Sequence, residues 1–172
     1  ATSVPGREGR IHRFMAEAFR DPASSPAILE RMLHAPDADV VKAALAHSLV
    51  GLYDGWGEDM IGILGAARSE KLAVAAIAAF RWAESEPGLA GLRIALDRPE
   101  AKLRETAASV AAWRADGLEL ATELRMALTD SDSPTRAMAA RALGYLRDLG
   151  GAEALLPILD DPSAEVRLHA LR

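Results

Sequence analysis

Apolar and polar positions alternate along the chain in a pattern that returns every 31 or 32 residues. Five copies of the pattern start at Val41, Leu72, Leu103, Thr135 and Val166. Four and eight residues after each start, apolar side chains follow, which is the spacing of one helix face. In the first four copies these positions hold Leu45, Ala76, Ala107 and Ala139, then Leu49, Phe80, Ala111 and Leu143. A fixed period of this length predicts stacked units, none of which buries its own apolar face alone.

Each unit is predicted to be a pair of helices. In the fourth copy, residues 117–128 follow the 3.6-residue period of an amphipathic first helix. A polar turn with a proline then interrupts the pattern, and the proline suits the first turn of a second helix over 134–146. Either Asp132 or Ser133 is expected to cap that second helix. The first helix of the last unit is expected at 152–159.

The whole chain, residues 1–172, is interpreted as a single domain of such units. Residues 1–10 are expected to form a loose arm, and residues 11–33 to form N-terminal helices. The last unit stops at Arg172, about halfway through its second helix, so a truncated final repeat is expected. Two readings of that end remain open, namely a piece of a longer chain and an end that pairs with a partner. Joints between units are expected at Gly55-Trp56-Gly57, Pro87-Gly88 and Gly150-Gly151.

The composition agrees with packed helices rather than a sheet. Hydrophobic residues make up 50% of the chain but aromatic residues only 5%, so alanine and the aliphatic residues dominate. The absence of cysteine removes disulfides, thiolate catalysis and cysteine-ligated metals, and it is compatible with a cytoplasmic location. The net charge of −5 weighs against binding to a phosphate backbone. No apolar run is long enough for a transmembrane helix.

Two segments resemble HEAT repeats, specifically the short bacterial kind also seen in phycobilin lyases. They are residues 128–144 (LTDSDSPTRAMAARALG) and residues 159–167 (LDDPSAEVR). The resemblance is strongest over residues 117–172 and weak before residue 87. It implies an all-α fold, an α/α superhelical solenoid of about five HEAT-like helix pairs. It also implies that the second helices line the inner surface of a slightly curved stack.

The resemblance further implies a ladder between successive repeats, made by an aspartate near each turn and an arginine that opens the second helix. Asp130 and Arg136 share a six-residue offset with Asp161 and Arg167. Arg104 holds the arginine position without an aspartate at that offset. We interpret these residues as structural, since partly buried ion pairs of this kind mainly fix the register between units.

A row of aromatic residues is the strongest candidate for a binding site. Trp82, Trp113 and Tyr145 occupy the tenth position after the start of three successive copies. Packed helices would place them about 10 Å apart. Tryptophan, tyrosine and arginine are enriched at interface hot spots, so the row resembles a peptide-binding stripe. Its neighbours would be Arg141, Met138, Ser109 and Thr106. The alternative, that the rings fold inward to fill space left by the alanines, stays open.

The sequence therefore favours a non-catalytic scaffold that binds a protein, peptide or helix on its concave surface. No catalytic constellation is found, and neither a metal nor a cofactor is expected, because the four histidines share no ligand spacing. Two enzymatic alternatives follow from the resemblance alone, a phycobilin-lyase-type subunit and an alkylpurine DNA glycosylase-like protein. The acidic net charge disfavours the glycosylase, which needs a cationic channel for DNA. End-to-end self-association is a further possibility for the last unit.

Overall fold

The computed structural model describes residues 56–67, 69–83, 85–148 and 150–171. Within these ranges the chain forms eight α-helices and three short 3-10 helices. The first helices of the pairs are α4 (Trp56–Ala66), α6 (Ser85–Leu96), α8 (Ala121–Ala127) and α10 (Gly151–Leu155). The second helices are α5 (Glu70–Ala79), α7 (Ala101–Ala111), α9 (Ser133–Tyr145) and α11 (Ala164–Ala170). The 3-10 helices are η2 (Phe80–Trp82), η3 (Gly117–Leu120) and η4 (Pro157–Asp160).

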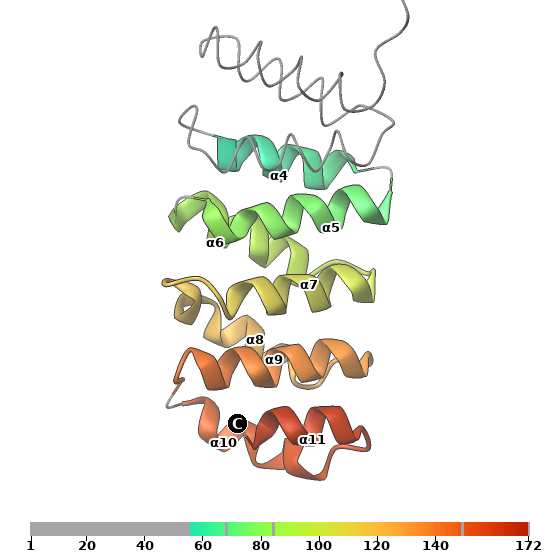
Figure 1. Cartoon of the computed structure of the whole chain (residues 1–172), viewed down its shortest axis with the longest axis vertical. Helices are drawn as coiled ribbons and strands as arrows, with labels where there is room; N and C mark the ends of the chain where they lie inside the picture. The colour runs from blue at the N-terminus through green and yellow to red at the C-terminus, as the bar shows by residue number, and fades with distance from the viewer. Residues whose placement is uncertain (1–55, 68, 84, 149, 172) are drawn as a thin grey trace, which may run out of the picture.

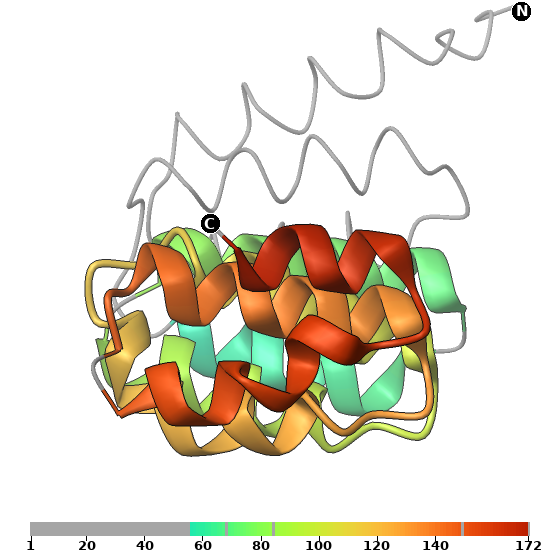
Figure 2. The same ribbon diagram turned by 90° about the horizontal axis from the view of Figure 1, so that it is seen from below.

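The helices stack as a column of pairs in two layers (Figures 1 and 2). In the layer of second helices, α5 contacts α7, α7 contacts α9, and α9 contacts α11. In the other layer, α4 contacts α6, α6 contacts α8, and α8 contacts α10. This arrangement confirms the all-α solenoid for the four described pairs. The fifth predicted pair, with its second helix near Val41, lies outside the described residues, as do the arm at 1–10 and the helices at 11–33.

The core lies between the two layers and is built largely from alanine and leucine. Ala76, Ala107 and Ala139, at the same position of successive second helices, are fully buried. Small side chains there let the helices approach closely, and larger groups fill the remaining space. The largest fully buried side chain among the described residues is Phe80, whose ring lies against Gly91 of α6. A methyl group on Gly91 would lie only 2.3 Å from that ring.

The second helices begin two residues before the apolar positions that mark the repeat. In α5 and α9, capping interactions explain this start. The Ser69 hydroxyl accepts a hydrogen bond from the Leu72 backbone N–H at 3.3 Å, and an Asp132 carboxylate oxygen accepts one from Thr135 N–H at 2.9 Å. The cap of α9 is thus Asp132, and Ser133 is the first helical residue. Both caps satisfy backbone donors that a helix start leaves without an intrahelical partner.

Several predicted boundaries were wrong. Pro87 and Gly88 lie inside the first turn of α6 rather than between units, because a proline loses no hydrogen bond in a first turn. Trp56 begins α4 instead of lying in a loop. The helix predicted at 117–128 is divided into η3 and α8. That predicted at 152–159 is divided into α10 and η4, since Pro157 has no N–H with which to continue α10.

Candidate functional site

The three aromatic residues of the predicted row lie on the surface, at the C-terminal ends of successive second helices. Trp82 ends η2 after α5, Trp113 follows α7, and Tyr145 is the last residue of α9. Their exposed fractions are 59%, 50% and 54%. The alternative that the rings fill space in the core is therefore wrong. The core between the layers holds alanines and the buried ring of Phe80 instead.

Two arginines lie among these rings. The guanidinium carbon of Arg81 is 4.9 Å from the ring centre of Trp82 and 5.2 Å from that of Trp113. That of Arg141 is 5.6 Å from the ring centre of Trp113 and 5.2 Å from that of Tyr145. Guanidinium groups at these distances are attracted to the faces of aromatic rings. We call the five residues the aromatic stripe.

The rings are closer together than helix spacing alone predicted. The ring centres of Trp113 and Tyr145 are 5.6 Å apart, and their planes are inclined by 55°. The expected 10 Å was wrong for this pair because the long side chains lean toward each other from neighbouring helices. Tilted pairs at such distances are favourable contacts beyond the area that they bury. The stripe is therefore a connected set of contacts rather than three separate rings.

The other predicted binding residues occupy the same helices as the stripe. Met138 and Arg141 lie on α9, two turns and one turn before Tyr145 respectively, and both are partly buried. Ser109 and Thr106 lie on α7 before Trp113, and they are also partly buried. The Thr106 hydroxyl donates a hydrogen bond to the Lys102 carbonyl at 2.7 Å. Of these neighbours, the structure joins only Arg141 to the rings.

Sequence reasoning missed Arg81. A signal was present in the repeat register, because the position of Arg81 holds Ala112 and Gly144 in the next two copies. Similarly, the position of Arg141 holds Ala78 and Ser109 in the two preceding copies. Where one copy has an arginine and the neighbouring copies have small residues at the same position, the arginine side chain has room to extend over the ring of the neighbouring copy. Comparing these positions between copies would have indicated that rings and guanidinium groups alternate.

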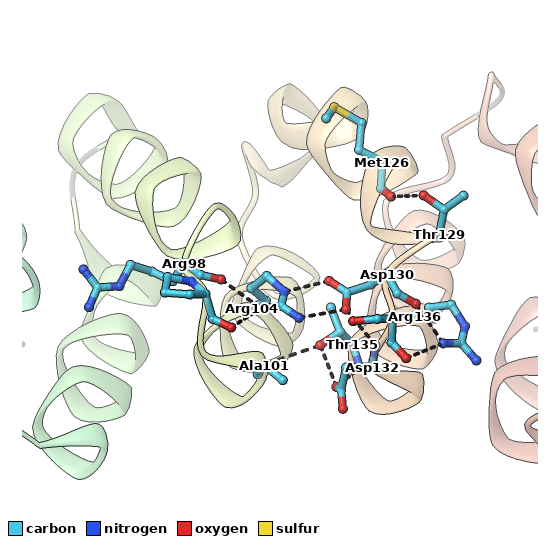
Figure 3. Close-up of polar contacts among 11 residues, drawn as sticks. Arg98, Ala101, Arg104, Met126, Thr129, Asp130, Asp132, Thr135 and Arg136 are labelled. Atoms are coloured by element: carbon cyan, nitrogen blue, oxygen red, sulfur yellow. Dashed lines mark hydrogen bonds and ion pairs between the residues drawn. The ribbon is translucent and has the colours of Figure 1, made fainter.

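The ladder of arginine and aspartate lies at the opposite ends of the second helices (Figure 3). Arg104 donates from Nε and Nη2 to the two carboxylate oxygens of Asp130 at 2.7 and 2.8 Å. Arg136 binds Asp161 in the same way at 2.7 and 2.9 Å. Each pair therefore connects one repeat to the turn of the next, which is the structural role that the resemblance implied. Bidentate pairs of this kind fix orientation as well as distance.

Each ladder arginine binds the backbone carbonyl of the residue six positions before it, and not an aspartate side chain at that position as the spacing suggested. Arg136 donates through Nη1 to the backbone carbonyl of Asp130 at 2.8 Å, not to its carboxylate. Arg104 makes the same bond to the carbonyl of Arg98 at 2.9 Å. It needs no aspartate at that offset, since any residue supplies a carbonyl. The aspartate serves the arginine of the preceding repeat.

Electrostatics at the ladder favour the ionised carboxylates. The hydrogen bonds from Arg104 lower the pKa of Asp130, although partial burial alone would raise it. The hydrogen bonds from Arg136 lower the pKa of Asp161 in the same way. Each carboxylate also accepts a backbone N–H two residues further on, from Asp132 and Ser163, both at 2.8 Å. These bonds stabilise the turn that precedes each second helix.

Thr135 shows why a polar residue is accepted at an otherwise apolar repeat position. It is fully buried, and its hydroxyl lies 2.8 Å from a carboxylate oxygen of Asp132 and 3.3 Å from the carbonyl of Ala101 in the preceding repeat. A buried hydroxyl is tolerated when it is hydrogen-bonded. Thr135 therefore adds a second contact between the same two repeats (Figure 3).

A further arginine, Arg114, is buried beneath the stripe and was not singled out from the sequence. Its guanidinium donates to the carbonyls of Phe80 and Ala83 in the preceding repeat, the latter at 3.1 Å. It also binds both carboxylate oxygens of Asp116 at 2.7 and 2.6 Å. Burial would raise the pKa of Asp116, but hydrogen bonds from Arg114 and Ser85 outweigh that effect and lower it. Arg114, next to Trp113 in the sequence, is thus bound to the carbonyls on either side of Trp82.

The last described pair carries three exposed leucines, Leu156, Leu168 and Leu171. Leu156 also lines a hollow together with Ala152, Leu155, Leu159 and Ala170. End-to-end association through this last pair stays a prediction.

Arg167 donates through Nη1 to the carbonyls of Asp161 and Pro162 at 2.7 and 3.1 Å, as its counterparts in the preceding repeats do.

The described residues contain neither a cluster of metal ligands nor a membrane-spanning helix. No group of three or more histidine, aspartate or glutamate side chains there could hold a metal ion. In the same part of the chain, none of the helices has the length and apolarity needed to cross a membrane.

Two layers of stacked helix pairs, with ion pairs between successive turns, define an α-solenoid repeat protein. The model of the family described as HEAT repeats matches residues 89–172. This part of the chain, from α6 to the C-terminus, therefore consists of HEAT repeats. A more particular likeness to phycobilin lyases is not borne out by these matches and stays a prediction.

One solved structure supports the fold over a longer stretch. The crystal structure of an engineered protein, a target of the Northeast Structural Genomics Consortium, is similar with a TM-score of 0.53. The similarity covers 99% of this chain and 90% of that chain at 20% identity, so it bears on the fold alone. No curated protein matches the chain.

Proposed function

We propose that this protein is an interaction scaffold that binds a peptide or a helix of another protein along the aromatic stripe. HEAT repeats are a fold of the scaffold kind, and the stripe supplies the particular surface. The observation that carries the proposal is the exposure of Trp82, Trp113 and Tyr145, each at least half exposed, at one position of three successive pairs. Large exposed rings that lie together are typical of interaction sites.

The stripe is suited to binding because it is already ordered. Its rings and guanidinium groups contact one another, and Arg114 binds the carbonyls on either side of Trp82. The stripe itself would therefore lose less conformational entropy on binding than mobile side chains would. Truncation of one such anchor in an interface commonly costs about 2 kcal/mol or more of binding free energy.

The two enzymatic alternatives are less favoured. A DNA glycosylase-like activity requires a cationic channel, whereas this chain carries a net charge of −5. In the ladder and beneath the stripe, Arg104, Arg136 and Arg114 are already bound to carboxylates. A lyase-type subunit would need a site for a tetrapyrrole, and the repeat alone carries no such specificity.

A matched pair of triple variants tests the proposal. One variant removes the rings (Trp82→Ala, Trp113→Ala, Tyr145→Ala), and the control removes three exposed apolar side chains of the other layer (Ile94→Ala, Leu118→Ala, Met126→Ala). A random peptide library is selected on the unmodified chain, and the affinities of the enriched peptides are measured by fluorescence polarisation. We expect at least a tenfold loss with the ring variant and less than a twofold change with the control.

Circular dichroism and thermal unfolding establish that both variants are folded before binding is compared. Equal affinity of the enriched peptides for both variants would contradict the proposal. So would a selection that enriches no peptide on the unmodified chain beyond the background found with the ring variant.

A further inference from the structure

The arginines of the aromatic stripe differ from most other arginines of the described chain in what they bind. Arg93, Arg98, Arg104, Arg114, Arg125 and Arg136 each form an ion pair with a carboxylate. Arg81 and Arg141 form no ion pair within the described ranges; their recorded contacts are with aromatic rings. This is notable in a chain with 25 acidic residues and 20 lysines and arginines.

Contact with a ring leaves the donors of a guanidinium group available. An arginine has five N–H donors in its plane, and stacking on a ring engages the face of that plane rather than its edge. The rings therefore hold Arg81 and Arg141 in place without satisfying their hydrogen bonds. The groups that match such an edge best are carboxylates and phosphates, which accept two parallel hydrogen bonds.

We propose that the aromatic stripe takes an acidic peptide segment, whose carboxylates pair with Arg81 and Arg141 while its apolar side chains cover the rings. This inference rests on the proposed function, because it names the chemistry of the partner at the same surface. Both guanidinium carbons lie within 5.6 Å of the Trp113 ring centre. Two carboxylates on one short segment can therefore reach both arginines, for example across two turns of a helix of about 5.4 Å pitch.

The net charge of the chain does not oppose this partner strongly. Charges further away than about 8 Å are largely screened at physiological ionic strength, so a segment on the stripe would interact mainly with nearby charges, which include Arg81 and Arg141. A single-stranded nucleic acid could also stack bases on the rings. Such a nucleic acid would carry a negative charge at every nucleotide. The two stripe arginines would neutralise few of those charges, and the protein itself is acidic. The observations favour the peptide.

The test compares two selections from one random peptide library, on the full unmodified chain and on the Arg81→Gln, Arg141→Gln double variant. We expect aspartate and glutamate to be enriched at least threefold over the library in the first pool and not in the second. A representative acidic peptide should bind the double variant about tenfold more weakly, and added salt should weaken its binding to the unmodified chain. An Arg98→Gln control, which removes an ion-paired arginine outside the stripe, should change the affinity less than twofold.

The outcomes separate this inference from the proposed function. If the selected peptides require the rings for binding but are not enriched in aspartate or glutamate, the inference is overturned and the proposed function stands. Tighter binding of a labelled oligothymidine than of the acidic peptide would overturn both. Glutamine replacements in the acidic peptide that leave its affinity unchanged would overturn the inference alone.

Discussion

Single substitutions in this protein should affect stability most where a backbone lies in close contact with a buried side chain. Gly91 is the clearest case, because the ring of Phe80 occupies the space that a side chain there would need. Gly62, in α4, has no atom within 4 Å of the equivalent point. The two glycines lie in first helices of the same stack, so they form a natural comparison between a packed and an open site.

Alanine at these two glycines should change stability in opposite directions. Gly91→Ala places a methyl group against a fully buried ring, and overpacking of this kind costs about 1–3 kcal/mol. Gly62→Ala replaces glycine by the best helix former in open space and should add up to about 1 kcal/mol. Urea unfolding followed by circular dichroism measures both. A Gly91→Ala protein as stable as the unmodified chain would show that Phe80 does not pack as described.

At the same scale, the sequence predicted some site residues and missed others. The register of the repeat placed Trp82, Trp113 and Tyr145 at one position, and the structure brings them to one exposed surface. The register alone does not determine whether these rings are buried, because the space beside them depends on how closely the alanine-rich helices approach one another. Arg81 and Arg114 were missed because their contacts cross between repeats. Such contacts leave no trace in the spacing within one copy.

At the scale of helices and turns, the ladder makes the joint between repeats depend on ionised aspartates. Arg104 and Arg136 bind Asp130 and Asp161 in bidentate pairs whose side chains are mostly shielded from solvent. The pKa of each aspartate is lowered in the folded chain from its ordinary value of 3.8, chiefly by the arginine hydrogen bonds. The folded state therefore holds these protons less tightly than the unfolded state does.

This difference predicts how stability depends on pH. The contribution of Asp130 and Asp161 is fully present well above pH 3.8, the ordinary pKa. It is lost as the pH falls below that value toward the lowered pKa of the folded chain, because the unfolded chain takes up protons first. The Asp130→Asn, Asp161→Asn variant should lose about 1–3 kcal/mol per site at pH 6. Its free energy of unfolding should fall less steeply between pH 5 and about pH 3.

Asp160→Asn is the matched control, because Asp160 is exposed and adjacent to Asp161. Urea unfolding at a series of pH values should give this control the same slope as the unmodified chain. An unchanged slope in the double variant would mean that the ladder aspartates do not have the lowered pKa values described.

Element boundaries were predicted well where caps are explicit and poorly where helices are short. An aspartate caps α9 and a proline lies in its first turn, and the start of this helix was predicted to within one residue. The division of the last first helix into α10 and η4 depends on Pro157 and on packing against α11. That packing is tertiary, so the apolar pattern of 152–159 alone could not reveal it.

At the scale of the whole molecule, the 31-residue period determined the architecture. A unit of that length can form two helices but cannot cover its own apolar face, so the units must stack. The described helices do so in two layers (Figure 2). The stacking places the ladder at one end of the second helices and the aromatic stripe at the other. The ladder stabilises the column of helix pairs, and the aromatic stripe is the surface for which we propose a partner.

The proposed function requires that the rings of the stripe are open to solvent in the free protein and are covered when a partner binds. Tryptophan fluorescence with acrylamide quenching tests it directly on a Trp56→Phe, Trp82→Phe variant, in which Trp113 is the only one of the three tryptophans left. We predict a red-shifted spectrum and ready quenching in the free protein, with a blue shift and at least a twofold lower quenching constant when an enriched peptide is bound. A blue-shifted, protected Trp113 in the free protein, or quenching that the bound peptide leaves unchanged, would contradict the account.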